Sequence, residues 1–167
     1  MANITQQAET RKRPRPKRRS KVLVLHGPFA ADAVGDPVLG PPGSAREIIA
    51  TIDARLTAKA KSAAIELIAF QSDHEDALIE RVLAAADEGV GFIVIDPAGL
   101  THSSVSLRAA LSSAAIPFIE VHLANVHARE PFRQRSVASD KVVGTIAGLG
   151  AHGYELALTY ALRQVKG

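Results

Sequence analysis

The most constraining feature of this sequence is an alternation between short apolar runs and longer segments with helical spacing. Strand-like runs rich in Val, Ile, Leu and Phe occur five times, at residues 22–25, 65–70, 92–95, 117–121 and 141–143. Segments with apolar residues at helical spacing lie at residues 45–56, 76–86, 104–113 and 150–165. Such an alternation predicts an α/β fold in which five parallel strands are covered by helices on both faces.

Length and composition narrow the class of protein. A chain of 167 residues is long enough for one domain with a sizeable core and too short for two ordinary ones. Cysteine is absent, which excludes disulfides and thiolate metal sites. The six histidines show no H-x-H or H-E-x-x-H spacing, so we expect no metal site. Because no apolar stretch is long enough for a membrane span or a signal peptide, we expect a cytoplasmic protein.

The charge of the chain is segregated. Residues 11–21 read RKRPRPKRRSK and hold eight of the twenty basic residues, while the chain from residue 22 onward carries twelve basic against sixteen acidic residues. Residues 1–20 lack apolar periodicity, and we interpret them as a disordered basic arm preceding one folded domain at 21–167. The arm either binds nucleic acid by neutralising phosphates or is a solvated tail without a partner. The lack of interleaved aromatic residues favours the tail.

Polar and charged residues gather where the predicted strands end. They form the groups 26–28, 71–75, 96–104 and 120–129, followed by Arg133 and Arg135. Parallel sheets bind ligands beyond the carboxyl ends of their strands, where these groups meet. The side chains expected within reach of one another are His102, Glu120, His122, Arg129 and Arg133. Imidazoles and guanidinium groups suit an anionic, hydroxylated small molecule. The alternative is structural: the histidines are hydrogen-bonding groups, and the arginines pair with Glu130 or with another subunit.

Two long motifs at these positions resemble a known family. Residues 99–108 read GLTHSSVSLR and resemble the G-G-L-T-H-T-S-x-A-L-R-D segment of type II 3-dehydroquinate dehydratases. Residues 119–133 read IEVHLANVHAREPFR and resemble that family's I-E-V-H-x-S-N-x-x-x-R-E-x-F-R. Shorter matches lie at residues 27–28, 71–75 and 148–154. The resemblance covers residues 21–164.

The resemblance implies a fold, an assembly and a reaction. The fold is a flavodoxin-like subunit, and the assembly is a homo-oligomer in which trimers build a twelve-subunit shell without cofactor or metal. The reaction is an anti elimination of water from a cyclic keto acid through an enolate. In this family a Tyr activated by an Arg, both on the loop after the first strand, removes the proton. A His after the fourth strand protonates the leaving hydroxyl.

Carried over residue by residue, the resemblance assigns roles to several positions of this chain. His122 occupies the position of the general acid, and Glu120 that of the carboxylate that orients it. His102 and Arg133 occupy positions that hold ring hydroxyls. The remaining positions of the implied substrate-binding set are Asp96, Ala124, Asn125 and Arg129.

The chain also departs from the family pattern where the reaction begins. Residues 26–44 contain neither Tyr nor Arg, so the base and its activator are missing. Phe29 stands where the first Asn belongs, and Asp96 replaces the Asn after the third strand. Ala124 replaces a carboxylate-holding Ser, and Ala109 replaces an Asp that reaches a neighbouring subunit. A carboxylate at position 96 would repel an enolate unless it were protonated.

These departures leave three hypotheses for function. The first is a diverged dehydratase or related lyase acting on another cyclic or hydroxylated carboxylic acid. The second is a non-catalytic protein that binds a small anion or serves as an oligomeric scaffold, with nucleic acid as a partner of its basic arm. The third is a true dehydroquinase with an unrecognised base. The retained pair of His122 and Glu120 favours the first hypothesis over the second, and the replaced loop weighs against the third.

Overall fold

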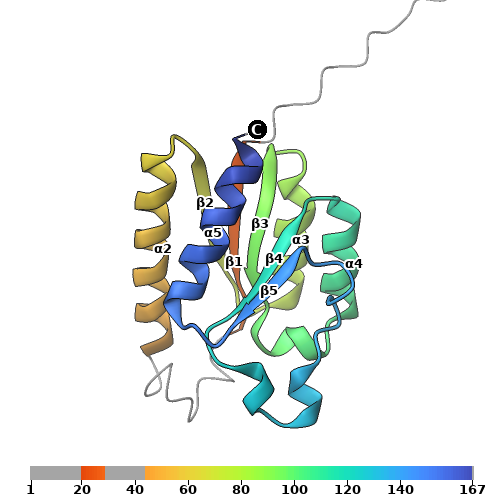
Figure 1. Ribbon diagram of the computed structural model, residues 1–167. Helices are drawn as coiled ribbons and strands as arrows, with labels where there is room; N and C mark the ends of the chain where they lie inside the picture. Colours follow the sequence, from red (N-terminus) through yellow and green to blue (C-terminus); the bar gives the residue numbers. More distant parts are fainter. Residues whose placement is uncertain (1–19, 29–43, 167) are drawn as a thin grey trace, which may run out of the picture.

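A five-stranded sheet forms the centre of the molecule. The computed structural model describes residues 20–28 and 44–166, and all strand pairs in it are parallel, in the order β2-β1-β3-β4-β5 (Figure 1). The strands are β1 (Lys21–His26), β2 (Glu66–Gln71), β3 (Val90–Asp96), β4 (Phe118–His122) and β5 (Gly144–Ala147). This is the flavodoxin-like α/β fold that the sequence predicts. Residues 1–19 of the expected arm and residues 29–43 of the first loop lie outside the described residues.

In the part of the chain that the structure describes, four α-helices cover the sheet in two layers. They are α2 (Ser44–Ser62), α3 (Glu75–Ala85), α4 (Val105–Ala114) and α5 (Ala151–Val165). Helices α2 and α5 cover one face of the sheet, while α3 and α4 cover the other (Figure 1). Three short 3-10 helices lie near the carboxyl ends of the strands: η1 (Ala98–His102), η2 (Val126–Ala128) and η3 (Pro131–Gln134). Among the described residues, no helix is long and apolar enough to cross a membrane.

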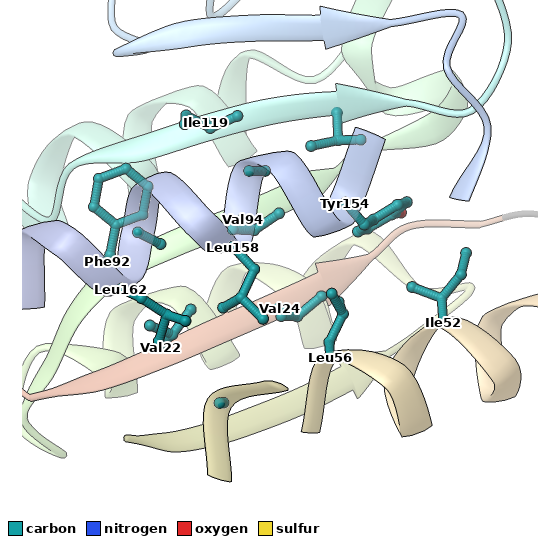
Figure 2. Packing of buried hydrophobic residues seen from close by; sticks show 14 of the residues in the cluster. Val22, Val24, Ile52, Leu56, Phe92, Val94, Ile119, Tyr154, Leu158 and Leu162 are labelled. Atoms are coloured by element: carbon teal, nitrogen blue, oxygen red, sulfur yellow. The ribbon is translucent and has the colours of Figure 1, made fainter. Parts of the chain in front are cut away.

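The core is divided by the sheet into two apolar clusters. Successive residues of a strand point to opposite faces, so Val22 and Val24 join the cluster under α2 and α5, whereas Leu23 and Leu25 join the one under α3 and α4. Figure 2 shows the first cluster, in which Leu158 of α5 is directed toward β1 near Val24. Because both faces are buried, the central strands are apolar along most of their length.

The last strand begins later than the sequence predicts. We expected it at residues 141–143, but β5 comprises Gly144–Ala147. The segment before it forms a turn, in which the amides of Lys141 and Val142 both donate to the carbonyl of Ala138 at 2.8 and 3.2 Å. Val142 packs against the apolar cluster beside α4 from this turn. Partial burial of a β-branched residue therefore produced a strand-like pattern in a segment that is not a strand.

The order of the strands favours a ligand-binding crevice at the carboxyl ends of β1 and β3. The chain leaves β1 toward β2 on one side and then returns to β3 on the other side, so the strand order reverses between β1 and β3. Ligand sites in such sheets lie at this switch point, beyond the carboxyl ends of the strands. The last residues of these strands, His26 and Asp96, are register partners. Two titratable side chains therefore meet at the position where the topology favours a site.

Candidate functional site

Four buried titratable side chains lie at the carboxyl ends of the three central strands. His26 ends β1, Asp96 ends β3, and Glu120 and His122 lie at the end of β4. All four are buried, although side chains of these types are mostly exposed in proteins. Buried charged groups require partners, and the partners of these residues define the site.

His122 and Glu120 form the pair that faces the solvent side of the site. Being two residues apart on one strand, they project from the same face of β4, and His122 Nε2 lies 2.6 Å from Glu120 Oε1. The other carboxylate oxygen of Glu120 accepts a hydrogen bond of 2.7 Å from the hydroxyl of Ser136. Burial alone would lower the pKa of His122, but the hydrogen bond to Glu120 and the nearby carboxylates outweigh it and raise this pKa. The arrangement therefore favours a protonated, oriented imidazole.

Asp96 faces the ring nitrogen of His122 that is not bonded to Glu120. Its Oδ1 is 3.7 Å from His122 Nδ1 and accepts a hydrogen bond of 2.9 Å from the amide of Ala98. Burial raises the pKa of Asp96, against the opposing effects of His122, of this amide and of His26. Burial therefore opposes ionisation of this carboxyl group, while the neighbouring imidazoles and the amide of Ala98 favour ionisation.

A second line of contacts joins Asp96 to helices α5 and α2. The hydroxyl of Tyr154 donates to Asp96 Oδ2 at 3.3 Å and lies 3.0 Å from His26 Nδ1. The other ring nitrogen of His26 lies 2.8 Å from Asp53 Oδ1. Tyr154 is fully buried, and this burial, together with Asp96, raises its pKa well above the ordinary value. Figure 2 shows its ring directed from α5 toward the end of β1.

This second line was not predicted as part of the site. The signal for His26 was its position at the end of the first strand, and that for Tyr154 was its place in the motif at residues 148–154. Neither signal indicates that the two side chains touch, because 128 positions separate them in the sequence. Asp53 and Ser136 carried no signal at all beyond their residue types.

A cavity of about 180 Å³ opens beside the pair formed by His122 and Glu120. It is lined by Thr101, Glu120, His122, Val126, His127, Arg133, Gln134, Arg135, Ser136, Ser139 and Thr145. Two guanidinium groups and two imidazoles on its wall favour a small anionic ligand. The hydroxyl of Thr101 is buried and has no hydrogen-bond partner within residues 20–28 and 44–166.

The structure brings some of the predicted site residues to this cavity. His122, Glu120 and Arg133 line it, and Arg133 Nε also lies 3.4 Å from Glu130 Oε2. An ion pair with Glu130 is the structural alternative that the sequence left open for this arginine. Since Glu130 is largely exposed, solvent screens this pair and weakens it.

The other predicted residues lie around the cavity without lining it. His102 Nδ1 lies 2.8 Å from the carbonyl of Arg135 and so braces the segment that carries the cavity wall. Asn125 caps η2 by accepting a hydrogen bond of 3.1 Å from the amide of His127. Arg129 is half-buried and its carbonyl accepts a hydrogen bond of 2.8 Å from Gln134, while Ala124 is half-buried at the end of β4. Within the described residues, no group of three or more His, Asp or Glu side chains is placed to hold a metal ion.

A family model and two curated relatives all match this chain to dehydroquinases. The family model described as dehydroquinase class II matches residues 20–162. The 3-dehydroquinate dehydratase of Chromobacterium violaceum is 53% identical over 144 residues, which cover 86% of this chain and 90% of the relative. The 3-dehydroquinate dehydratase of Halorhodospira halophila is 51% identical over 147 residues, or 88% of this chain and 97% of the relative.

Solved structures of similar proteins share the fold. The type II dehydroquinase from Propionibacterium acnes superimposes with a TM-score of 0.73 at 34% identity, covering 86% of this chain and 97% of that one. A 3-dehydroquinate dehydratase-like protein from Bifidobacterium longum superimposes with a TM-score of 0.63 at 28% identity, covering 86% and 96% of the two chains.

Proposed function

Because the chain belongs to the class II dehydroquinase family, we propose that it is a diverged dehydratase or related hydro-lyase with little or no activity on 3-dehydroquinate. Its substrate is a cyclic or hydroxylated carboxylic acid. The observation that carries the proposal is the 2.6 Å contact between His122 and Glu120 on the wall of the cavity. This contact supports proton donation in a chain that has neither Tyr nor Arg at residues 26–44, where the resemblance places the base and its activator.

The pair is suited to protonate a leaving hydroxyl. A buried carboxylate fixes the imidazole in one orientation and raises the pKa of His122, which favours the protonated ring. Ser136 occupies the second oxygen of Glu120, which prevents that carboxylate from turning away. A positioned acid of this kind contributes about 10²–10⁴-fold to a rate.

The first step of the family reaction lacks its expected residues. No Tyr and no Arg occurs at positions 26–44. Loss of a general base costs about 10²–10⁴-fold in rate, although losses within one site do not add. We therefore infer that this chain differs from its family in the step that removes the proton. Either its substrate carries a more acidic proton, or a residue other than a Tyr on the first loop acts as the base.

The test is a substrate panel. Purified full-length protein is incubated with 3-dehydroquinate and with related cyclic and hydroxylated carboxylic acids, and dehydration is followed by enone absorbance and by the mass loss of water. We expect one of the related acids to be converted, and 3-dehydroquinate to be converted slowly or not at all. A turnover number for 3-dehydroquinate within tenfold of that of the Chromobacterium violaceum enzyme would refute the proposal.

The competing function is a non-catalytic anion-binding or scaffold protein. His122→Asn separates the two, because asparagine keeps some hydrogen bonding and removes the titratable proton. In an enzyme this change abolishes turnover and leaves ligand binding nearly intact. His127→Asn is a matched control, since His127 lines the same cavity but contacts neither Glu120 nor Asp96 in the described structure. A scaffold would tolerate both changes equally, with no acid of the panel converted by any variant.

A further inference from the structure

A continuous line of polar side chains runs from the surface of α2 to the centre of the sheet. It passes from Asp53 to His26 at 2.8 Å, from His26 to Tyr154 at 3.0 Å and from Tyr154 to Asp96 at 3.3 Å. Four different elements, α2, β1, α5 and β3, supply its members. The side chain of Asp53 is 26% exposed, whereas the other three residues are buried. The line therefore joins a deeply buried carboxyl group to a carboxylate in contact with solvent.

Counting protons along this line leaves two arrangements. A phenol has one proton and can donate it to only one neighbour. If Tyr154 donates to Asp96, the carboxyl group is ionised, and His26 must be doubly protonated to donate to both Tyr154 and Asp53. If Tyr154 donates to His26 Nδ1, then Asp96 carries the proton and donates to the phenol oxygen, while His26 is neutral with its proton on Nε2. Every contact is satisfied in both arrangements.

The charge of His122 decides between the two arrangements. Its Nδ1 lies 3.7 Å from Asp96 Oδ1, which is too far for a good hydrogen bond but close enough for a strong interaction between charges in a buried site. An imidazolium at His122 stabilises the ionised form of Asp96. When His122 is neutral, the carboxylate of Asp96 would instead face that of Glu120 without a compensating charge, so protonation of Asp96 is favoured.

We propose that His26, Tyr154 and Asp96 form a charge-compensating proton relay for His122. As His122 gives the proton on Nδ1 to the oxygen of the leaving hydroxyl, it keeps the proton on Nε2 that is bonded to Glu120. The proton on His26 Nδ1 then passes to the oxygen of Tyr154, and the phenol proton passes to Asp96 Oδ2. This inference rests on the proposed function, because it assigns the relay to an acid at His122.

The relay avoids a change of net charge at the buried centre. His122, Glu120 and Asp96 together carry one negative charge both before and after the proton leaves. The change appears at His26, beside the partly exposed Asp53, where solvent can compensate it. Since a buried unpaired charge is costly, moving the change toward solvent lowers the cost of proton donation. Tyr154, His26 and Asp53 are accordingly positioning residues, because they act through Asp96 and His122.

The groups that face the relay set its response to pH. Asp96 is influenced by His122, His26, Glu120 and Tyr154. His122 faces Asp96 and Glu120, and the charged or titratable side chains that share its cavity are His127, Arg133 and Arg135. The two arginines do not titrate near neutral pH, so His127 is the one titratable neighbour in the cavity lining that a control must remove.

The test measures the protonation of His26 by ¹⁵N NMR in the full-length protein. The comparison is between wild type and His122→Gln, which replaces the imidazolium by a neutral amide. The relay predicts that the protonated fraction of His26 falls in the variant at a pH where His122 is charged in wild type. Direct repulsion between two imidazolium groups predicts the opposite sign. His127→Gln is the control and should leave His26 unchanged.

A second set of variants interrupts the line itself. In Tyr154→Phe, which keeps the ring, His122→Gln should no longer change the protonation of His26. Asp53→Asn acts at the partly exposed end, should preserve the fold, and removes the partner of protonated His26. In that background His26 should stay neutral whether or not position 122 carries a charge. An unchanged or increased protonated fraction of His26 in the single variant His122→Gln would overturn the relay.

Failure of the relay and failure of the proposed function give different results. If an acid of the panel is converted while His122→Gln does not lower the protonation of His26, the relay is wrong and the hydro-lyase function stands. If the coupling has the predicted sign and no acid is converted by wild type, the relay's proton transfer exists but its assignment to catalysis is wrong. If wild type converts an acid of the panel and the coupling between His122 and His26 has the predicted sign, Tyr154→Phe should lower kcat. KM should stay nearly unchanged, because the phenol does not line the cavity.

Discussion

At the scale of single residues, the site is defined by which side chains are buried together. Arg133 is the cavity cation that the sequence most directly predicts, and its contact with Glu130 is exposed to solvent. A pair of that kind contributes little to stability, because solvent screens it and ordering the side chains costs entropy. Loss of the contact with Glu130 when a carboxylate binds would therefore cost little free energy.

Arg133→Ala should weaken binding of the converted acid by about 1.5–3 kcal/mol, because a hydrogen bond to a charged group is lost. Arg133→Lys is the matched variant and should recover part of the loss, since it restores the charge without the bidentate geometry. Titration calorimetry measures both. Equal affinity for wild type and Arg133→Ala would show that the carboxylate binds elsewhere.

His122 should also give the protein a stability that depends on pH. Its pKa is raised in the folded state, so the folded protein holds this proton at pH values where the unfolded chain releases it. The contribution is fully present below the unfolded pKa of about 6.5 and is lost as pH rises through the raised pKa. Urea denaturation across that window should show a free energy of unfolding that falls with pH. The fall should be smaller in His122→Asn, and an identical slope in the variant would contradict the assignment.

Residue types at strand ends predicted part of the site. The residues that they did not predict were missed for a physical reason. His122 and Glu120 were predicted as a pair from the resemblance to the family, and they meet in the structure because two residues of one strand share a face. The contact of His26 with Tyr154 depends on how α5 lies against β1, which is a property of tertiary packing. Reasoning from strand ends expected His102 and Arg129 within reach of His122, but it could not say which side chains line the cavity, because loop paths are not encoded in spacing.

At the scale of elements, the junction between β1 and the segment after β3 holds the site together. The amide of Gly27 donates to the carbonyl of Asp96 at 2.8 Å, and a Cβ at Gly27 would lie 2.5 Å from the carbonyl oxygen of Pro97. The obstacle is backbone and cannot rotate away. Glycine is therefore required where the two central strands end, directly beside His26 and Asp96.

Gly27→Ala should destabilise the protein by about 1–3 kcal/mol, the usual range for overpacking a well-packed site. It should also disturb the imidazole signals of His26 and His122, because the strand ends must separate. Gly144→Ala in β5 is the matched control, since a Cβ there meets nothing within 4 Å. Urea denaturation compares the two. Equal, small changes in the free energy of unfolding of both variants would mean that the strand ends can separate at little cost.

The strands were predictable because buried parallel strands are nearly continuous apolar runs, and four of the five lie where expected. Burial along the last helix was less predictable. Leu156 and Tyr160 are each 42% exposed, whereas Tyr154 and Leu158 are buried. Tyr154 and Leu158 lie on one face of the helix because they are four residues apart. Which face of α5 is buried depends on where the helix begins.

At the scale of the whole molecule, we propose an assembly built on trimers, which the twelve-subunit shell of the family would extend. The edge strand β5 has one neighbour in the sheet, and exposed apolar side chains occur in the segments around the cavity and β5, including Phe132 and Leu149 at 65% and 52% exposure. Apolar surface of this kind favours association. Light scattering should give a mass of at least three subunits at micromolar concentration. A mass near 17.6 kDa would rule the assembly out.

The basic arm is the part of the chain whose role is separable from the fold. Residues 1–20 contain no apolar run able to join a core, so a protein beginning at residue 21 should keep the free energy of unfolding of the full chain. If the arm binds nucleic acid, its basic residues at 11–21 should make the affinity fall by roughly 10³–10⁵-fold between 50 and 200 mM salt. Deletion should abolish that binding, and an oligomer would amplify it by presenting several arms at once. Fluorescence anisotropy with labelled DNA, at several salt concentrations and with both proteins, measures each effect. Binding that is insensitive to salt, or that survives the deletion, would place the contact on the folded domain.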